Sequence, residues 1–208
     1  MVNTTSSSPA QISFLGEAIR KLTHTGALII PVSYYYFDMS KRDMLFFVGG
    51  AFLLMLLIDI SRIKKISIWN NFIKKIISPI IRQHEFAGDF TGATYILLSI
   101  FLTILLFSKP IAVTAIAFIM VGDSLAALIG RKFGRHKVFK TKSIEGFMGC
   151  LSGTLIVAYF APELTFYVTI PGAVIAAIVE LLPLQIDDNL TVPLISGLFM
   201  MIIKVIIL

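Results

Sequence analysis

The stretch from Val121 to Gly149 gathers the residues best suited to chemistry in an otherwise apolar chain. Asp123 interrupts an apolar run, where a charge near the centre of a membrane helix costs about 2.5–3.5 kcal/mol. Glycines, which let a backbone approach a ligand, and basic residues, which pair with phosphate oxygens, follow: Gly122, Gly130, Gly134 and Gly146, and Arg131, Lys132, Arg135, Lys137, Lys140 and Lys142. Since a nearby carboxylate suits a divalent cation, the stretch predicts a nucleotide-phosphate site at a membrane surface. A basic loop that only follows the positive-inside rule is the plainer alternative.

A second polar cluster lies near the C-terminal end of the chain. Glu180 stands within an apolar run, and Asp187-Asp188-Asn189 opens the final run. Two carboxylates and an amide suit Mg²⁺, and a carboxylate also accepts the proton of an alcohol during phosphoryl transfer. Because this cluster is distant in sequence from Asp123, a common site requires a fold that brings both to one end of a bundle.

Three smaller groups have plainer interpretations when they are taken alone. Arg20 and His24, beside Lys21, lie four positions apart and share a helix face, as juxtamembrane anchors do. Glu85 alone predicts a solvated cap residue. Asp59 and Arg62, three positions apart, predict a structural ion pair, with the orientation of a pocket ligand as the alternative.

Taken together, these segments resemble one known family over about residues 16–199. The chain resembles the CTP-dependent lipid kinases, namely dolichol kinase, phytol kinase and CTP-dependent diacylglycerol kinase. The elements are Arg-Lys-x-x-His from Arg20, Glu85 followed by Gly-x-x-Tyr from Gly92, Gly-Asp-x-x-Ala from Gly122, Lys-Ser-x-Glu-Gly from Lys142 and Asp-Asp-Asn-x-Thr-x-Pro from Asp187. The middle stretch is also similar to the phosphatidate cytidylyltransferases, but their C-terminal Ser-x-x-Lys-Arg segment has no counterpart here.

The resemblance implies transfer of the γ-phosphate of CTP to the hydroxyl of a membrane lipid alcohol, with Mg²⁺ bridging the phosphates. The implied catalytic residues are Lys142 and a proton-accepting carboxylate among Glu85, Glu180 and Asp188. The implied metal ligands are Asp123, Asp187, Asp188 and Asn189. The implied nucleotide-binding residues are Arg20, Lys21, His24, Gly122, Gly130, Arg131, Gly134, Arg135, Lys142, Ser143, Glu145 and Gly146.

Composition places these residues in a membrane protein. The 208 residues are 57% hydrophobic and 14% charged, with a mean hydropathy of +0.89, which excludes an ordinary soluble domain. We expect an all-α fold, a polytopic integral membrane bundle of about seven transmembrane helices, in a single membrane-embedded domain over 14–208 that follows a disordered polar tail over 1–13. The apolar runs cover roughly 22–37, 43–60, 91–107, 110–128, 144–160, 170–182 and 190–207. The segment 61–85 predicts a basic amphipathic helix in the membrane interface, anchored by Trp69.

Charge predicts the orientation and the partners. Most basic residues fall on the side of the N-terminus, so the positive-inside rule places the N-terminus and the active site in the cytoplasm. The net charge of +6 suits anionic lipid headgroups and anionic ligands, and without a stacking platform it does not indicate nucleic-acid binding. The expected location is the plasma membrane of a prokaryote or the endoplasmic reticulum membrane of a eukaryote.

Two alternatives to a kinase stay open. A phosphatidate cytidylyltransferase would use the same nucleotide and release pyrophosphate with CDP-diacylglycerol. A small ion-coupled transporter would use its buried acids to carry protons or cations and would not consume CTP. The acceptor is also open, because diacylglycerol, phytol-like prenols and long polyprenols all present a hydroxyl near the headgroups. Nor does the sequence predict an oligomeric state.

Overall fold

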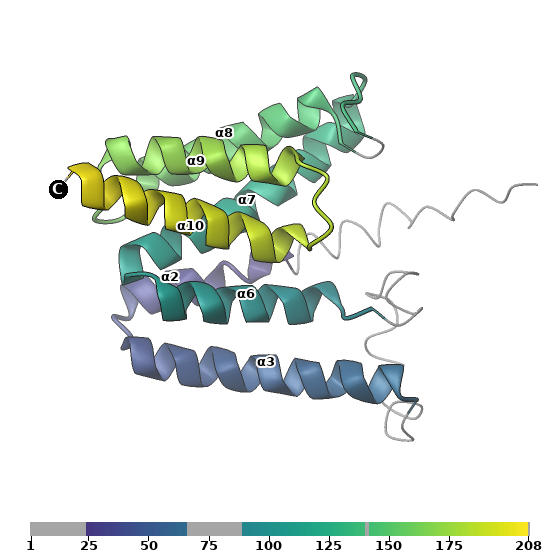
Figure 1. The fold of residues 1–208 in the computed structure, drawn as a ribbon, viewed down its shortest axis with the longest axis vertical. Coiled ribbons are helices and arrows are strands. Elements are labelled where there is room, and N and C mark those ends of the chain that lie inside the picture. Colours follow the sequence, from purple (N-terminus) through teal and green to yellow (C-terminus); the bar gives the residue numbers. More distant parts are fainter. Residues whose placement is uncertain (1–23, 66–88, 140–141, 208) are drawn as a thin grey trace, which may run out of the picture.

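The computed structural model describes residues 24–65, 89–139 and 142–207. Within these ranges every regular element is a helix, as expected, and Figure 1 shows the helices stacked side by side in a bundle. They are α2 (Ile29–Tyr36), α3 (Lys41–Ile63), α6 (Gly92–Leu106), α7 (Lys109–Phe133), α8 (Ile144–Phe160), α9 (Phe166–Leu181) and α10 (Asp188–Ile207). Each predicted apolar run overlaps one of them, and several of the helices extend beyond the run.

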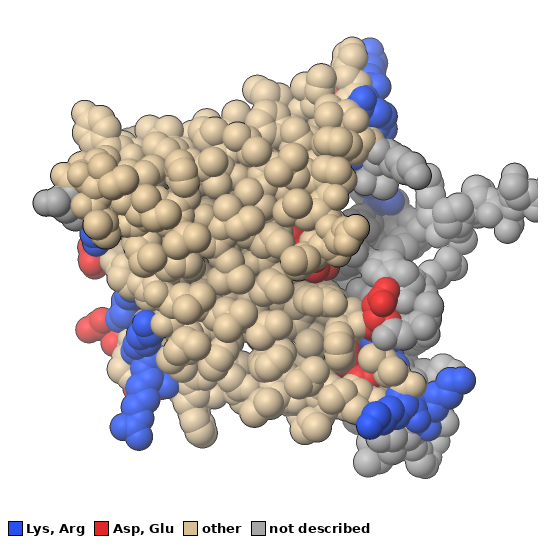
Figure 2. All heavy atoms as spheres, in the orientation of Figure 1, with Lys and Arg blue, Asp and Glu red and all other residues tan. Residues whose placement is uncertain are grey.

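The lengths of the helices agree with a membrane protein. Three described helices, α3, α7 and α10, are long and apolar enough to cross a bilayer. The apolar helices α6, α8 and α9 have 15, 17 and 16 residues, somewhat fewer than the roughly 20 that a straight span prefers. Figure 2 shows charged side chains gathered toward two opposite ends of the bundle, with a broad apolar band between them.

Side-chain caps and proline define where several helices begin. Ser40 accepts a hydrogen bond from the backbone N–H of Asp43 at the start of α3, and Ser143 accepts one from Gly146 at the start of α8. Asp187 precedes α10 and accepts a bond from the N–H of Asn189. Pro110 lies in the first turn of α7, where its missing N–H costs nothing. Each cap satisfies a donor that a helix end leaves without an intrahelical partner.

Helix α7 forms the centre of the bundle. It contacts α2, α6, α8, α9 and α10, whereas α3 packs on α6. The side chains of Ile116, Phe118 and Met120 on α7 are almost wholly buried. A functional residue on α7 therefore has neighbours from several other helices.

The closest helix pair, α7 and α8, meets along a seam of small residues. A Cβ added to Gly149 on α8 would lie 2.9 Å from the carbonyl oxygen of Leu125 on α7. One added to Gly130 on α7 would lie 3.3 Å from the Cα of Gly146 on α8. Small residues allow such close backbone contact between membrane helices. The seam fixes the position of the loop that joins the two helices.

Two predicted segments fall wholly or largely outside the described residues. The polar tail over 1–13 does so entirely, and the predicted interfacial helix over 61–85 does so beyond Lys65. Its first residues belong to α3, which continues to Ile63. The interfacial helix itself therefore stays a prediction.

Candidate functional site

Polar residues from five parts of the chain meet where α9 ends and α10 begins. His24 precedes α2, Asp123 lies on α7, Lys142 lies in the loop between α7 and α8, and Glu180 lies in the last turn of α9. Asp188 and Asn189 open α10. We call His24, Asp123, Lys142, Glu180, Asp188 and Asn189 the polar cluster. The predicted convergence of the two acidic regions is thus present in the structure.

One half of the polar cluster is built around His24. This side chain is buried, with only 4% of the residue exposed. Its Nε2 lies 2.7 Å from Oδ1 of Asn189 and 3.7 Å from Oδ2 of Asp123. Because residue 24 and residue 189 are 165 positions apart, this contact joins the two ends of the chain at one point.

The other half is built around Lys142. Its Nζ donates to Oδ2 of Asp188 at 2.9 Å and lies 3.3 Å from Oε1 of Glu180, and it also donates to the backbone carbonyl of Glu180. Burial lowers the pKa of Lys142, but the carboxylates of Glu180 and Asp188 outweigh that effect, so the pKa is raised above its ordinary value. Lys142 therefore carries a positive charge at neutral pH.

The two halves form one electrostatic unit. Asp123 acts electrostatically on both Glu180 and Asp188. Neighbouring positions on α10 supply Asp188 to one half and Asn189 to the other. Three carboxylates and one lysine from four segments therefore share a small volume, as is common at functional sites that handle charged substrates.

Asp187 has a different environment from Asp188. Its Oδ1 accepts from the backbone N–H of Asn189 at 2.9 Å and from the Asn189 side-chain amide at 2.7 Å. These bonds cap α10 and orient Asn189 toward His24. The structure thus gives Asp187 a positioning role, while its predicted role as a metal ligand stays a prediction.

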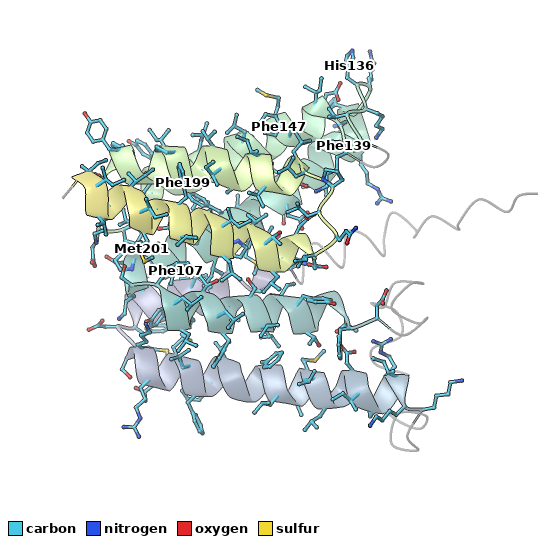
Figure 3. The ribbon with its side chains drawn as sticks, viewed as in Figure 1. Phe107, His136, Phe139, Phe147, Phe199 and Met201 are labelled. Atoms are coloured by element: carbon cyan, nitrogen blue, oxygen red, sulfur yellow. The ribbon has the colours of Figure 1, made fainter. Side chains whose placement is uncertain are left out.

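The loop between α7 and α8 presents basic side chains to solvent. Backbone hydrogen bonds from Val138 to Lys142 and from Ile144 to His136 close the loop. Arg131 and Arg135 are exposed, whereas Lys142 extends inward to the polar cluster. His136 lies at the outer tip of the loop, beyond Phe139 (Figure 3), and its Nδ1 is 2.7 Å from Oε1 of Glu145. Glu145 therefore holds the loop in place.

The predicted nucleotide-binding glycines pack between helices. Gly130 and Gly146 face each other across the α7–α8 seam, and an added Cβ on Gly122 would lie 3.0 Å from Sγ of Cys150. An added Cβ on Gly134 would lie 2.8 Å from Oγ of Ser143, a buried side chain that caps α8. These contacts give the glycine spacing a packing role, and a nucleotide contact at these positions stays a prediction.

The structure adds one pair that the sequence did not predict. Oγ1 of Thr25 lies 2.7 Å from Oγ of Ser124, directly beside His24 and Asp123. Single hydroxyl residues carry no sequence signal, and the pairing depends on how α2 packs on α7. Arg20, Lys21 and Glu85 lie outside the described residues.

The described residues suit a cation that binds together with a nucleotide better than they suit a metal site formed by protein side chains alone. Among them, no group of three or more His, Cys, Asp or Glu side chains is arranged to hold a metal ion by itself. Mg²⁺ is commonly bound by one or two carboxylates together with substrate phosphates. Asp123 and Asp188, whose side chains are 23% and 35% exposed, are the acids of the polar cluster most open to such a cation.

Known proteins resemble this chain, two of the three described here over most of its length. An uncharacterized protein of Rickettsia prowazekii is 32% identical over 86% of this chain and 90% of its own. The CTP-dependent diacylglycerol kinase 1 of Saccharomyces cerevisiae is 24% identical over 88% of this chain and 72% of its own. The chloroplastic farnesol kinase of Arabidopsis thaliana is 36% identical over 44% of this chain and 35% of its own. No family model and no solved structure matches the chain.

These relatives agree with the motifs and with the fold. The yeast protein aligns with both the first and the second half of this chain, as its coverage requires. The described residues of the motifs converge in one polar cluster at the end of a helical membrane bundle. The chain belongs to the family of CTP-dependent lipid kinases.

Proposed function

We propose that this protein is an integral-membrane kinase that transfers the γ-phosphate of CTP to the hydroxyl of a membrane lipid alcohol. The observation that carries the proposal is the meeting of Lys142, Glu180 and Asp188 with His24, Asp123 and Asn189 at one end of the bundle. Phosphoryl transfer requires positioned charge rather than a covalent intermediate. The relatives with named activities are kinases, so neither the cytidylyltransferase nor the transporter is favoured.

In this proposal Lys142 neutralises phosphate oxygens. Its ammonium lies among carboxylates, and an incoming triphosphate would compete with Asp188 for it. Arg131, exposed in the last turn of α7, and Arg135, exposed on the loop that follows, extend the positive surface along which CTP arrives. Mg²⁺, held by Asp123 and Asp188 together with the phosphates, would neutralise the remaining charge.

A carboxylate of the polar cluster accepts the proton of the attacking hydroxyl. The lipid oxygen forms a bond to the γ-phosphorus, the bond between this phosphorus and the β–γ bridging oxygen breaks, and CDP leaves. Glu180 is the favoured base because it also contacts Lys142, whereas Asp188 is assigned to the cation. His24 and Asn189 are positioning residues that hold the start of α10 against α7.

The proposed topology has seven spans, with the N-terminus and the polar cluster in the cytoplasm. The exposed basic residues at the end of α7 and in the loop after it, Arg131, Lys132, Arg135 and Lys137, would then face anionic lipid headgroups. A cysteine placed between residues 130 and 140 should react with an impermeant reagent only from the cytoplasm, and one placed at Glu163 only from outside. Labelling of both from one side would contradict this topology.

A purified-protein assay tests the activity itself. The protein in lipid vesicles would receive CTP labelled on the γ-phosphate, Mg²⁺ and, one at a time, a diacylglycerol, a phytol-like prenol and a long polyprenol. Transfer of the label to one lipid, with release of CDP, is the expected result. A further reaction supplies phosphatidate in place of the alcohol, and release of labelled pyrophosphate with CDP-diacylglycerol there would instead identify a cytidylyltransferase. No turnover of CTP with any of these lipids would contradict both.

A further inference from the structure

An apolar groove runs along the outside of the bundle and ends beside the polar cluster. Helices α2 and α8 both pack on α7, and the groove of about 260 Å³ lies between them. Its walls are apolar side chains from all three helices, with Val32 on α2, Ala117 and Val121 on α7, and Ile156 and Phe160 on α8 among them. The hydroxyl of Thr114, also in the lining, donates to the carbonyl oxygen of Pro110. A molecule in the groove therefore need not accept a hydrogen bond from it.

One end of the groove lies one helical turn from a pair of hydroxyl groups. Leu28 and Val121 line its inner part, and Thr25 and Ser124 follow one helical turn away on the same two segments, with their hydroxyl oxygens 2.7 Å apart. His24 and Asp123, members of the polar cluster, are the adjacent residues. A molecule lying along the groove therefore has its end near Thr25 and Ser124 within one turn of the polar cluster.

The other end of the groove lies toward the opposite end of the bundle. Tyr35 and Pro162 line this end, and the Tyr35 hydroxyl donates to Oε1 of Glu163 at 3.0 Å, tying α2 to the loop between α8 and α9. From Val113 to Val121 the groove follows α7 for about 12 Å, at 1.5 Å per residue. It is thus a slot of limited length with one apolar and one polar end.

We propose that this groove binds the hydrocarbon chain of the lipid alcohol and delivers its hydroxyl to the polar cluster past Thr25 and Ser124. The proposal rests on the proposed kinase activity. An elongated amphiphile with one hydroxyl matches a slot that is apolar along its length and polar at one end. Bulk lipid would also cover an apolar groove, but it gives no reason for the groove to end at the polar cluster. Ala117 and Val121 are then specificity-determining residues for the acceptor chain.

A bulky side chain at Ala117 tests the proposal. Ala117→Phe fills the middle of the groove, and Ala51→Phe, on α3 and away from the groove, is the matched control. Two acceptors are compared: a long-chain diacylglycerol, and a water-soluble diacylglycerol whose chains end before Ala117, about 10 Å from Ser124 along α7. Ala117→Phe should raise KM for the long-chain acceptor about tenfold or more, leave the short-chain acceptor within about threefold and leave KM for CTP unchanged, while Ala51→Phe changes none of them.

An equal rise in KM for both acceptors, or no rise for either, would contradict the proposed role of the groove and leave the proposed kinase activity untouched. No transfer to any lipid by the unchanged protein would contradict the proposed function instead. Should Ala117→Phe not fold, a diacylglycerol with a photoreactive group in its chain provides a direct measurement on the unchanged protein. Cross-links on α2, α7 or α8 at groove residues are expected. Cross-links confined to α3 or α10 would show that the lipid chain binds elsewhere. A disulfide-linked dimer through a cysteine placed at Ala117 would show that a second copy of the protein covers the groove. Either result would overturn the proposal.

Discussion

The Asp59–Arg62 ion pair and the polar cluster both combine carboxylates with a basic side chain, but their surroundings differ. Asp59 and Arg62 join the end of α3 to the start of α6, and both residues are buried. Oδ1 of Asp59 accepts from Nη2 of Arg62 at 3.0 Å, and Oδ2 accepts from the N–H of Thr91 at 2.7 Å and from the hydroxyl of Thr94 at 2.7 Å. Nη2 of Arg62 also donates to the carbonyl oxygen of Asp89. Both oxygens of the Asp59 carboxylate therefore accept hydrogen bonds from groups within the protein.

The polar cluster differs in that its Asp188 retains unused hydrogen-bonding capacity. Asp188 accepts from Lys142 through Oδ2, and within the described residues no hydrogen bond to its Oδ1 is present. Its side chain is 35% exposed, whereas that of Asp59 is 1% exposed. A carboxylate oxygen accepts about two hydrogen bonds, so Asp188 can bind a further ligand and Asp59 cannot. The sequence interpretation of Asp59 and Arg62 as a structural ion pair is confirmed, and the comparison predicts that mutations at the two sites have different consequences.

The largest expected effect is on turnover. Asp123→Asn and Asp188→Asn should each lower kcat by ~10²-fold or more, the scale seen for single electrostatic groups in active sites. The double mutant should lose much less than the product, because both act on one metal and triphosphate. Rates are measured with CTP and the preferred lipid, and thermal unfolding in detergent is the control. Well-folded single mutants with near-normal rates would contradict the site assignment.

Lys142 separates the contribution of charge to activity from its contribution to stability. Lys142→Met should lower kcat by ~10²-fold and also destabilise the fold by about 1–3 kcal/mol, since Glu180 and Asp188 lose their partner. Lys142→Met combined with Glu180→Gln should recover stability without recovering turnover.

The pH dependence of this stability difference follows from the raised pKa of Lys142. A lysine with a raised folded pKa contributes stability that is fully present below its unfolded pKa and lost as pH rises through the folded pKa. The difference between the unchanged protein and Lys142→Met should therefore be constant from about pH 6 to 9 and decrease only above the ordinary lysine range. A decrease within that interval would contradict the ion-pair account.

Asp59 should show the opposite behaviour to Asp188. Asp59→Asn removes the negative charge opposite Arg62 and weakens several hydrogen bonds, so we expect a loss of about 2 kcal/mol in the free energy of unfolding. Turnover per folded molecule should stay within about twofold. Thermal unfolding and active-fraction measurements on the same preparation give both quantities. A large fall in specific activity would show that Asp59 contributes to the reaction and would contradict the contrast with Asp188.

Sequence patterns predicted the elements better than the contacts between them. Apolar runs predicted each described helix, and the polar clusters at one side of these runs predicted that Asp123 and Asp188 would lie at the same end of the bundle. Spacing did not distinguish Asp187, which caps α10, from Asp188, which contacts Lys142, because adjacent acids look alike until the helix start is known. The Thr25–Ser124 pair was not predictable either, since it depends on the packing of α2 on α7.

The smallest effect concerns the α7–α8 seam, where Gly149 packs beside Gly130 and Gly146, two of the glycines interpreted as phosphate-binding positions. Gly149→Ala would bring a Cβ to 2.9 Å from the backbone oxygen of Leu125, and backbone cannot yield as a flexible side chain can. We expect α7 and α8 to separate slightly, at a cost of about 1 kcal/mol. Gly50→Ala is the matched control, because its Cβ would meet no atom within 4 Å and the change favours helix. Thermal unfolding should show a lower midpoint for Gly149→Ala and an unchanged or higher one for Gly50→Ala. Equal midpoints would mean that the seam tolerates a methyl group, and that its glycines need an explanation other than packing.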